Sequence, residues 1–247
     1  MIDKEVLVKL LEISEQNKHL FSLKHSNRAK RLIFKPSIRH GFEIVLPRLY
    51  DDNWVLNAIA KDRSKIDKNL TEIKQAREAL KPVYVDLPII GGHWQVIYKK
   101  GVNEERYSHI TEISSTIEVT EDLEDVFAAP KLLQEWLHEK ALEYLPRHLD
   151  TVALQLGFSY NKVRVKRQRT RWGSCSAKRN INLNRNLMFM PFEVVDYVLH
   201  HEIVHLKFLD HSSKFWNEVE RLFPNYRIGR QQLKHLGDNK VPEWAVV

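Results

Sequence analysis

The sequence predicts an α+β protein, with a β-rich N-terminal half followed by a C-terminal core that contains several helices. Two observations predict this class. Apolar residues alternate in short runs within 21–47 and 83–120, whereas they recur at helical spacing over 130–156. The chain has 247 residues, of which 43% are hydrophobic, and this suffices for a sizeable core. We expect two parts, residues 1–125 and residues 126–247.

The first elements alternate between strand and helix patterns. Residues 4–20 fit a short helix or an irregular arm, and their pattern does not decide between the two. Residues 31–35 and 42–46 read as strands that each lead into a proline and are joined by a hairpin loop. At Asp51 and Asp52 the spacing of apolar residues becomes helical, so one of these two residues is the expected N-cap.

Three strand-like runs follow, over 83–90, 94–99 and 106–120, and they end in an acidic connection. Residues 130–156 then predict a long amphipathic helix. The alternating residues 162–168 predict a strand with one basic face.

The remaining elements surround a turn-rich stretch over residues 170–176. Residues 181–184 alternate again and are expected to form the returning strand. A helix is expected to begin at Pro191, because proline is favoured in the first turn of a helix. Two more helices are expected over 213–223 and 228–236.

Charge is unevenly distributed along the chain, whose formal net charge is +7. No acidic residue occurs between Thr151 and Phe192, a window that holds nine lysines and arginines. This segment could attract phosphates, nucleic acid or acidic substrates, and the alternative is a solvated strand face. The single cysteine, Cys175, excludes an internal disulfide and is expected to be a small, partly buried side chain. With no signal-peptide layout and no apolar run of membrane length, we expect a cytoplasmic protein with no membrane partner.

A metal site is indicated by the run His201-Glu202-Ile203-Val204-His205, which lies inside the helix expected to begin at Pro191. Histidines at positions i and i+4 lie on one helical face, so both rings can bind one metal ion. The carboxylate of Glu202 can then reach a water on that metal without binding the metal itself. This arrangement is typical of zinc-dependent hydrolysis, although another divalent metal would also fit the pattern.

His211 is the candidate third ligand, because catalytic zinc sites use three protein ligands and leave one position open. A continuous helix would place His211 well off the face that carries His205. We therefore expect a break near Leu209 and Asp210, with Asp210 supplying the bend in a left-handed conformation. The alternative is that His211 is an N-cap or a surface residue.

Several stretches of the C-terminal half form one combined pattern: Arg169–Ser176, Ile181–Asn184, His201–Lys207, His211–Ser212 and Phe215–Trp216. In this combination the chain resembles the YgjP-like metallopeptidase family and, more distantly, SprT-like zincins. The resemblance implies a zincin-like metallopeptidase core with an active-site helix. It also implies metal ligands at His201, His205 and His211, and a general base at Glu202.

The function expected is metal-dependent hydrolysis by a HExxH enzyme, with Zn2+ as cofactor and a peptide or protein as substrate. A peptide is expected to pair with residues 181–184 as an edge strand, and the candidate substrate-binding residues are Arg169, Arg171, Asn182 and Asn184. His235 or Arg230 in the last helix could serve as an oxyanion partner.

Two alternatives remain open at this point. One is hydrolysis of a nucleoside triphosphate to a monophosphate and pyrophosphate, with the basic strand over 162–171 binding the phosphates. The other is a nucleic-acid binding protein that has a purely structural zinc site.

Overall fold

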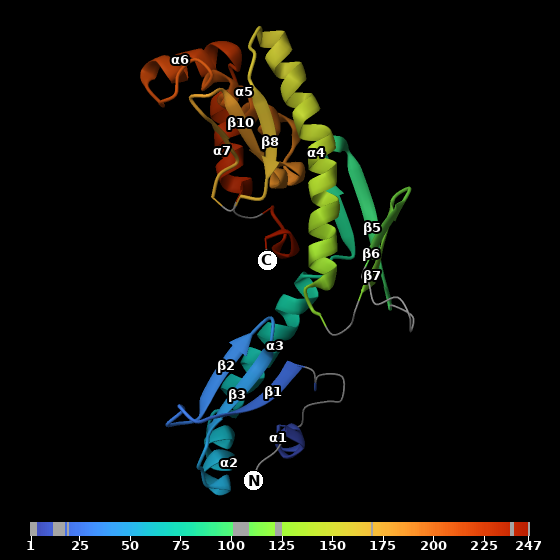
Figure 1. The fold of residues 1–247 in the computed structure, drawn as a ribbon, viewed down its shortest axis with the longest axis vertical. Helices are drawn as coiled ribbons and strands as arrows, with labels where there is room; N and C mark the ends of the chain where they lie inside the picture. The colour runs from blue at the N-terminus through green and yellow to red at the C-terminus, as the bar shows by residue number, and fades with distance from the viewer. Residues whose placement is uncertain are drawn as a thin grey trace. The chain divides into compact units, whose positions relative to one another are not determined.

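The computed structural model describes residues 4–11, 18, 20–100, 109–121, 125–168, 170–237 and 240–246 (Figure 1). The chain divides into two compact units, Met1–Lys81 and Pro82–Val247. Strands prevail in the N-terminal half and helices follow, which confirms the α+β class. Residues 82–125, which the sequence pattern groups with the N-terminal part, pack in the second unit. That residues 126–247 carry the activity stays a prediction.

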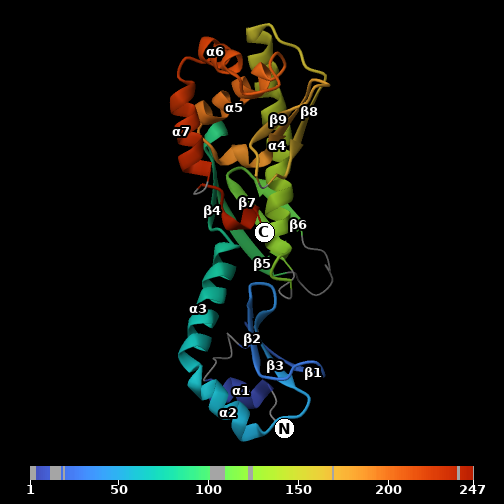
Figure 2. The ribbon, with the colours of Figure 1, turned by 90° about the vertical axis from the view of Figure 1, so that its left-hand side faces the viewer.

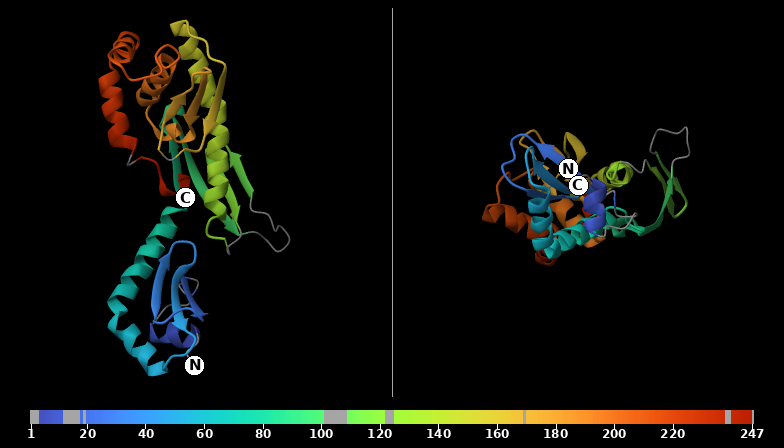
Figure 3. Two further views of the ribbon diagram at one scale, coloured as in Figure 1. Left: turned by 60° about the vertical axis from the view of Figure 1, so that its left-hand side comes forward. Right: turned by 90° about the horizontal axis from the view of Figure 1, so that it is seen from below.

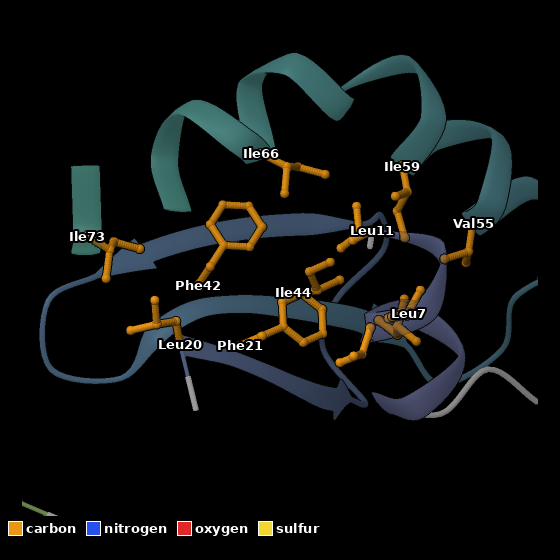
Figure 4. Close-up of a cluster of buried hydrophobic side chains, with 12 residues drawn as sticks. Leu7, Leu11, Leu20, Phe21, Phe42, Ile44, Val55, Ile59, Ile66 and Ile73 are labelled. Atoms are coloured by element: carbon orange, nitrogen blue, oxygen red, sulfur yellow. The ribbon is translucent and has the colours of Figure 1, made fainter. Parts of the chain in front are cut away.

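The first unit is a three-stranded sheet covered by helices. The strand order is β1-β3-β2, with β1 parallel and β2 antiparallel to β3. Figure 4 shows that Ile59 and Ile66 from the helices meet Phe42 and Ile44 from β3 in a buried apolar core. The elements are α1 (Lys4–Leu10), β1 (Phe21–Ser26), β2 (Ile33–Ser37), β3 (Gly41–Pro47), α2 (Asp52–Lys61) and α3 (Arg63–Ala79).

Two local features of this unit follow directly from the residue types. Asp51 is the N-cap of α2, because its Oδ1 accepts the N–H of Trp54 at 2.8 Å. Gly41 ends the hairpin loop with φ +76°, and a Cβ there would lie 2.2 Å from the carbonyl oxygen of Leu20. Only glycine fits this position. The antiparallel pairing of β2 with β3 confirms the expected hairpin.

The second unit begins with a four-stranded sheet of order β4-β5-β7-β6 that lies along the long helix α4 (Figure 3). Glu112 of β6 links this sheet to α4. Its carboxylate accepts hydrogen bonds from the indole nitrogens of Trp94 (2.9 Å) and Trp136 (2.8 Å) and from Lys140 (2.9 Å). The elements are β4 (Tyr84–Leu87), η2 (Pro88–Ile90), β5 (Gly92–Lys100), β6 (His109–Ile113), β7 (Thr116–Glu121) and α4 (Ala128–Leu156).

A small sheet of β8 (Lys162–Lys166), β9 (Gly173–Cys175) and β10 (Asn180–Asn184) follows. Its order is β8-β10-β9, with β10 parallel to β8 and antiparallel to β9. The expectation that residues 181–184 form an edge strand is therefore wrong. The turn-rich stretch contains the short strand β9, which pairs with β10 through a tight turn at Arg179 (φ 58°) and takes the edge position.

The last elements surround α5 (Phe192–Val204), whose apolar side chains are mostly buried. Figure 2 shows α6 (Ser213–Leu222) and α7 (Tyr226–Gly237) beside α5, and β9 also contacts α5. Two short helices complete the unit, η3 (Arg185–Phe189) and η4 (Glu243–Ala245). No helix among the described residues is long and apolar enough to cross a membrane.

Candidate metal centre

Three histidines converge at the C-terminal end of α5. The Nε2 atom of His201 lies 3.2 Å from that of His205 and 3.1 Å from that of His211. The ligand atoms of all three histidines lie within 4.8 Å of one another. Nitrogen atoms this close suit joint coordination of one cation, so the set expected from the sequence is brought together in space.

The path from α5 to His211 differs from the expected one. The helix already ends at Val204, whose carbonyl accepts the N–H groups of both Lys207 and Phe208. Asp210 does not adopt a positive φ, since Ser114 and Arg179 are the only described non-glycine residues that do. Its Oδ1 instead accepts the N–H of Ser212 at 3.2 Å, which fixes the turn that returns His211.

Aromatic packing and one hydrogen bond hold the histidine rings in place. The ring of Phe215 lies 4.9 Å, 4.5 Å and 4.8 Å from the ring centroids of His201, His205 and His211. The Nδ1 of His205 pairs with the carbonyl oxygen of Phe208 at 2.9 Å. With Nδ1–H donating there, the lone pair of Nε2 is directed toward the other two rings.

Electrostatics favour the neutral rings of His201 and His205. Burial, together with the charges of His205, His211 and Arg230, lowers the pKa of His201 to about 3. Burial also lowers the pKa of His205. Neutral imidazoles are the form that binds metals.

Glu202 supplies a buried carboxylate next to the first histidine. It is 4% exposed, and its Oε2 has no hydrogen-bond partner among the described residues. Burial raises its pKa to about 8, although Arg171 opposes the shift. Buried polar atoms are normally hydrogen-bonded, so this oxygen is expected to have a partner that is not a protein atom. The three imidazole nitrogens fit a divalent metal ion, and Glu202 lines the same pocket as His201.

A pocket of about 370 Å3 opens beside His201 and Glu202. Three of its wall residues stand out chemically: Tyr197, Arg230 and Lys234. Of these, only Arg230 was considered from the sequence. Tyr197 precedes His201 by four residues, and this same-face spacing on α5 is the signal that could have revealed it. The remaining wall residues are Thr170, Arg171, Trp172, Gly173, Val198 and Leu233.

The substrate-binding residues expected from the sequence have different positions. Arg171 lines the pocket that Glu202 also lines, and its substrate-binding role stays a prediction. The side-chain amide of Asn182 donates to Ser174 Oγ at 3.0 Å. The amide of Asn184 donates to the carbonyls of Gln168 (2.9 Å) and Arg171 (2.8 Å), so Asn184 shapes the loop that carries Arg171. Arg169 lies outside the described residues.

The basic segment does not form one phosphate-binding strand beside the histidines. Of its described residues, Arg171 lines the histidine pocket, whereas Lys166 and Arg167 line another cavity. Arg164 is exposed on β8. The segment therefore brings a single described arginine to the site.

Two side chains near the site, His200 and Cys175, have surroundings that do not favour a role in the chemistry. The Nδ1 of His200 pairs with the carbonyl oxygen of Asp196 at 2.8 Å, and its ring packs against Phe223, so it points away from the centre as expected. Cys175 is a half-buried free thiol whose pKa is raised to about 11 by burial and by the charge of Glu202. Such a thiol is a poor nucleophile at neutral pH.

Comparison with known proteins gives one family and two similar structures. The family described as YgjP-like, metallopeptidase domain, matches residues 30–236 and confirms the resemblance. The chain is 28% identical to a metallopeptidase zymogen, abylysin of Pyrococcus abyssi, over 38% of this chain and 93% of that one, with a TM-score of 0.33. It is 22% identical to the metallopeptidase zymogen jannalysin of Methanocaldococcus jannaschii, over 36% and 91%, with a TM-score of 0.32. No curated protein matches the chain.

Proposed function

We propose that this chain, which belongs to the YgjP-like metallopeptidase family, is a zinc-dependent peptidase in which Glu202 acts as general base. One observation carries the proposal. Three histidine Nε2 atoms converge, and His201 lines one pocket with Glu202, whose buried Oε2 has no partner among the described residues. This donor set provides three metal ligands and one proton acceptor, which are the groups that metal-assisted hydrolysis requires.

His201, His205 and His211 would hold the metal. When bound, zinc would supply Lewis-acid activation of a water and of the scissile carbonyl group. Glu202 would accept the proton of the attacking water at Oε2 and later deliver it to the departing amine. Glu202 is 4% exposed and lines the same pocket as His201, which supports this role.

We expect the peptide to pair with β9 instead of β10. The strand β9 lies at the edge of its sheet, and its first residue, Gly173, lies directly against Glu202. An extended peptide added to this edge would pass next to the base and the histidines. The cationic side chains of Arg171, Arg230 and Lys234 in the adjoining pocket would bind a carboxylate of such a substrate.

The same three cations favour a second candidate function. Hydrolysis of a nucleoside triphosphate to a monophosphate and pyrophosphate would place the phosphate chain against Arg171, Arg230 and Lys234. A purely structural zinc site would need a fourth protein ligand. The metal-binding group found among the described residues contains only three, which favours the two enzymatic candidates.

The metal site is tested by elemental mass spectrometry of the purified protein. We expect about one zinc ion per chain in the wild type and a clear loss in His211→Ala. The matched control is His40→Ala, which removes an exposed histidine from the first unit and should leave the zinc content unchanged. Equal zinc in wild type and His211→Ala would remove His211 from the ligand set. Absence of zinc uptake by the wild type would refute the proposal.

The substrate class is tested with the zinc-loaded protein. A mixed peptide library and the four nucleoside triphosphates are incubated separately, and the products are identified by mass spectrometry. New peptide termini that require Glu202 support the peptidase. Release of pyrophosphate that requires Glu202, without peptide cleavage, would establish the second candidate instead.

A further inference from the structure

Arg185, the first residue of η3, is a buried cation without an ionic partner. It is 4% exposed, and its Nη1 and Nη2 atoms donate to the backbone carbonyls of Gln134 (2.9 Å) and Ala245 (2.8 Å). Its Nε is buried and has no hydrogen-bond partner within the described chain, and no described carboxylate forms an ion pair with Arg185. A buried charge held only by neutral acceptors is unfavourable unless another group compensates it.

A cavity of about 630 Å3 has Arg185 in its wall. Its walls come from α4, from the end of β8 with the following residue, and from Arg185 itself. Figures 1 and 3 show α4 running beside β8, and the two elements are in contact. We call this cavity the Arg185 pocket. It shares no described wall residue with the pocket beside the histidines.

The charges around the Arg185 pocket favour an anion. Lys166 and Arg167 line it together with Arg185. Burial and the charge of Arg167 lower the pKa of Arg185 to about 10, so the two guanidinium groups repel each other. The acidic wall residues Glu135 and Glu139 are exposed and form no ion pair with Arg185. Lys131, also in the wall, is paired with Asp125 at 3.3 Å.

A second unsatisfied polar atom belongs to the same pocket. The Nδ1 of His138 on α4 is buried and has no hydrogen-bond partner within the described chain. Burial and the nearby charge of Arg185 lower the pKa of His138, which favours the neutral ring. A neutral imidazole can carry its proton on Nδ1 and donate it to an acceptor. Arg185 and His138 therefore each offer the pocket a buried nitrogen that lacks a partner.

We propose that the Arg185 pocket binds a small oxyanion, a phosphate or carboxylate group, through Arg185, Arg167 and His138. Negatively charged oxygens are the acceptors that guanidinium groups bind most strongly, and one such group would satisfy the buried nitrogens and separate the two repelling arginines. The bound anion would connect α4, η3 and β8. Because it binds the folded chain, it should raise the melting temperature in a saturable way.

Binding is measured on the metal-free full chain by isothermal titration calorimetry and thermal unfolding. Inorganic phosphate and acetate are titrated separately at constant ionic strength, which is maintained with chloride. We expect saturable binding of at least one of them, weakened about tenfold or more in Arg167→Gln. Arg164→Gln is the matched control, because it removes an exposed arginine three residues earlier that does not line the pocket.

A second readout locates the anion. In chain labelled with 15N-arginine, a buried Nε–H exchanges slowly with water, so the Arg185 signal is observable and should shift with the same saturation curve. Arg230→Gln should leave this shift of the Arg185 signal unchanged, because Arg230 lines only the histidine pocket. The proposal is overturned if neither anion saturates, or if Arg164→Gln weakens binding as much as Arg167→Gln. This result is independent of zinc binding and of turnover.

Discussion

Adding one methyl group at Gly173 should disable the proposed base without touching the metal ligands. An ideal Cβ at this position would lie 2.5 Å from Oε1, 2.7 Å from Cγ and 2.8 Å from Cδ of Glu202. Favourable contacts between such atoms begin at about 3.5 Å, so the carboxylate of Glu202 would have to move by about 1 Å. Glu202 is 4% exposed, so little space is available for this movement.

The magnitude follows from that displacement. A misplacement of about 1 Å at a reacting group can reduce turnover about a hundredfold, and overpacking a buried site costs about 1–3 kcal/mol of stability. We expect Gly173→Ala to show both losses and to retain its zinc. Turnover on the best substrate, urea unfolding and zinc content are measured on the same preparation.

A double-mutant cycle separates this contact from a general effect on β9. Glu202→Asp shortens the side chain by one methylene and frees the space that the new Cβ needs. In the Glu202→Asp background, Gly173→Ala should therefore cost little stability, while turnover should stay low because the carboxylate has withdrawn. Wild-type turnover in Gly173→Ala, or an equal stability cost in both backgrounds, would show that the contact between Gly173 and Glu202 does not position the base.

Three further predictions concern the second unit. Glu112→Gln should lower the free energy of unfolding by about 1–2 kcal/mol at pH 7. Burial alone would raise the pKa of Glu112, but hydrogen bonds from Lys140 and two tryptophans outweigh it and lower the pKa. Its stabilising effect is therefore present above its ordinary pKa and disappears as the pH falls through the lowered one, so urea midpoints of variant and wild type should converge in acid. Phe215→Leu should weaken zinc binding about tenfold or more in chelator competition, because Phe215 packs against all three histidine rings; unchanged affinity would contradict this. Cys175 should react with iodoacetamide at neutral pH about a hundredfold more slowly than a free thiol, because its pKa is raised to about 11. The reaction should be faster in Glu202→Gln, because the charge of Glu202 contributes to the raised pKa. A fast reaction in the wild type would count against that pKa.

The sequence pattern predicts a feature correctly where contacts between residues close in the chain determine it. The spacing of His201 and His205 fixes their common face on any helix, and the structure confirms it. Asp51 as N-cap also follows from local hydrogen-bonding chemistry. In both cases the deciding contacts lie within four residues along the chain.

Long-range pairing explains most of what the sequence pattern missed. The three residues of β9 carry no strand signal of their own and form a strand only because β10 pairs with them. This pairing moves β10 from the edge to the centre of its sheet. Lys234 reaches the pocket from α7, a separate helix, and no spacing along the sequence relates it to the histidines. The bend before His211 was expected from a strained Asp210, but a side-chain hydrogen bond to Ser212 forms it without strain.

The role of Glu202 is tested by comparing the zinc-loaded wild type with Glu202→Gln. Zinc content and substrate turnover are determined on the same samples. The proposed mechanism predicts equal zinc in both proteins and a loss of turnover of about a hundredfold to ten-thousandfold in the variant, because glutamine cannot accept the proton of the attacking water. Turnover in the variant within a few fold of the wild type, at equal zinc content, would contradict the role of Glu202 as general base.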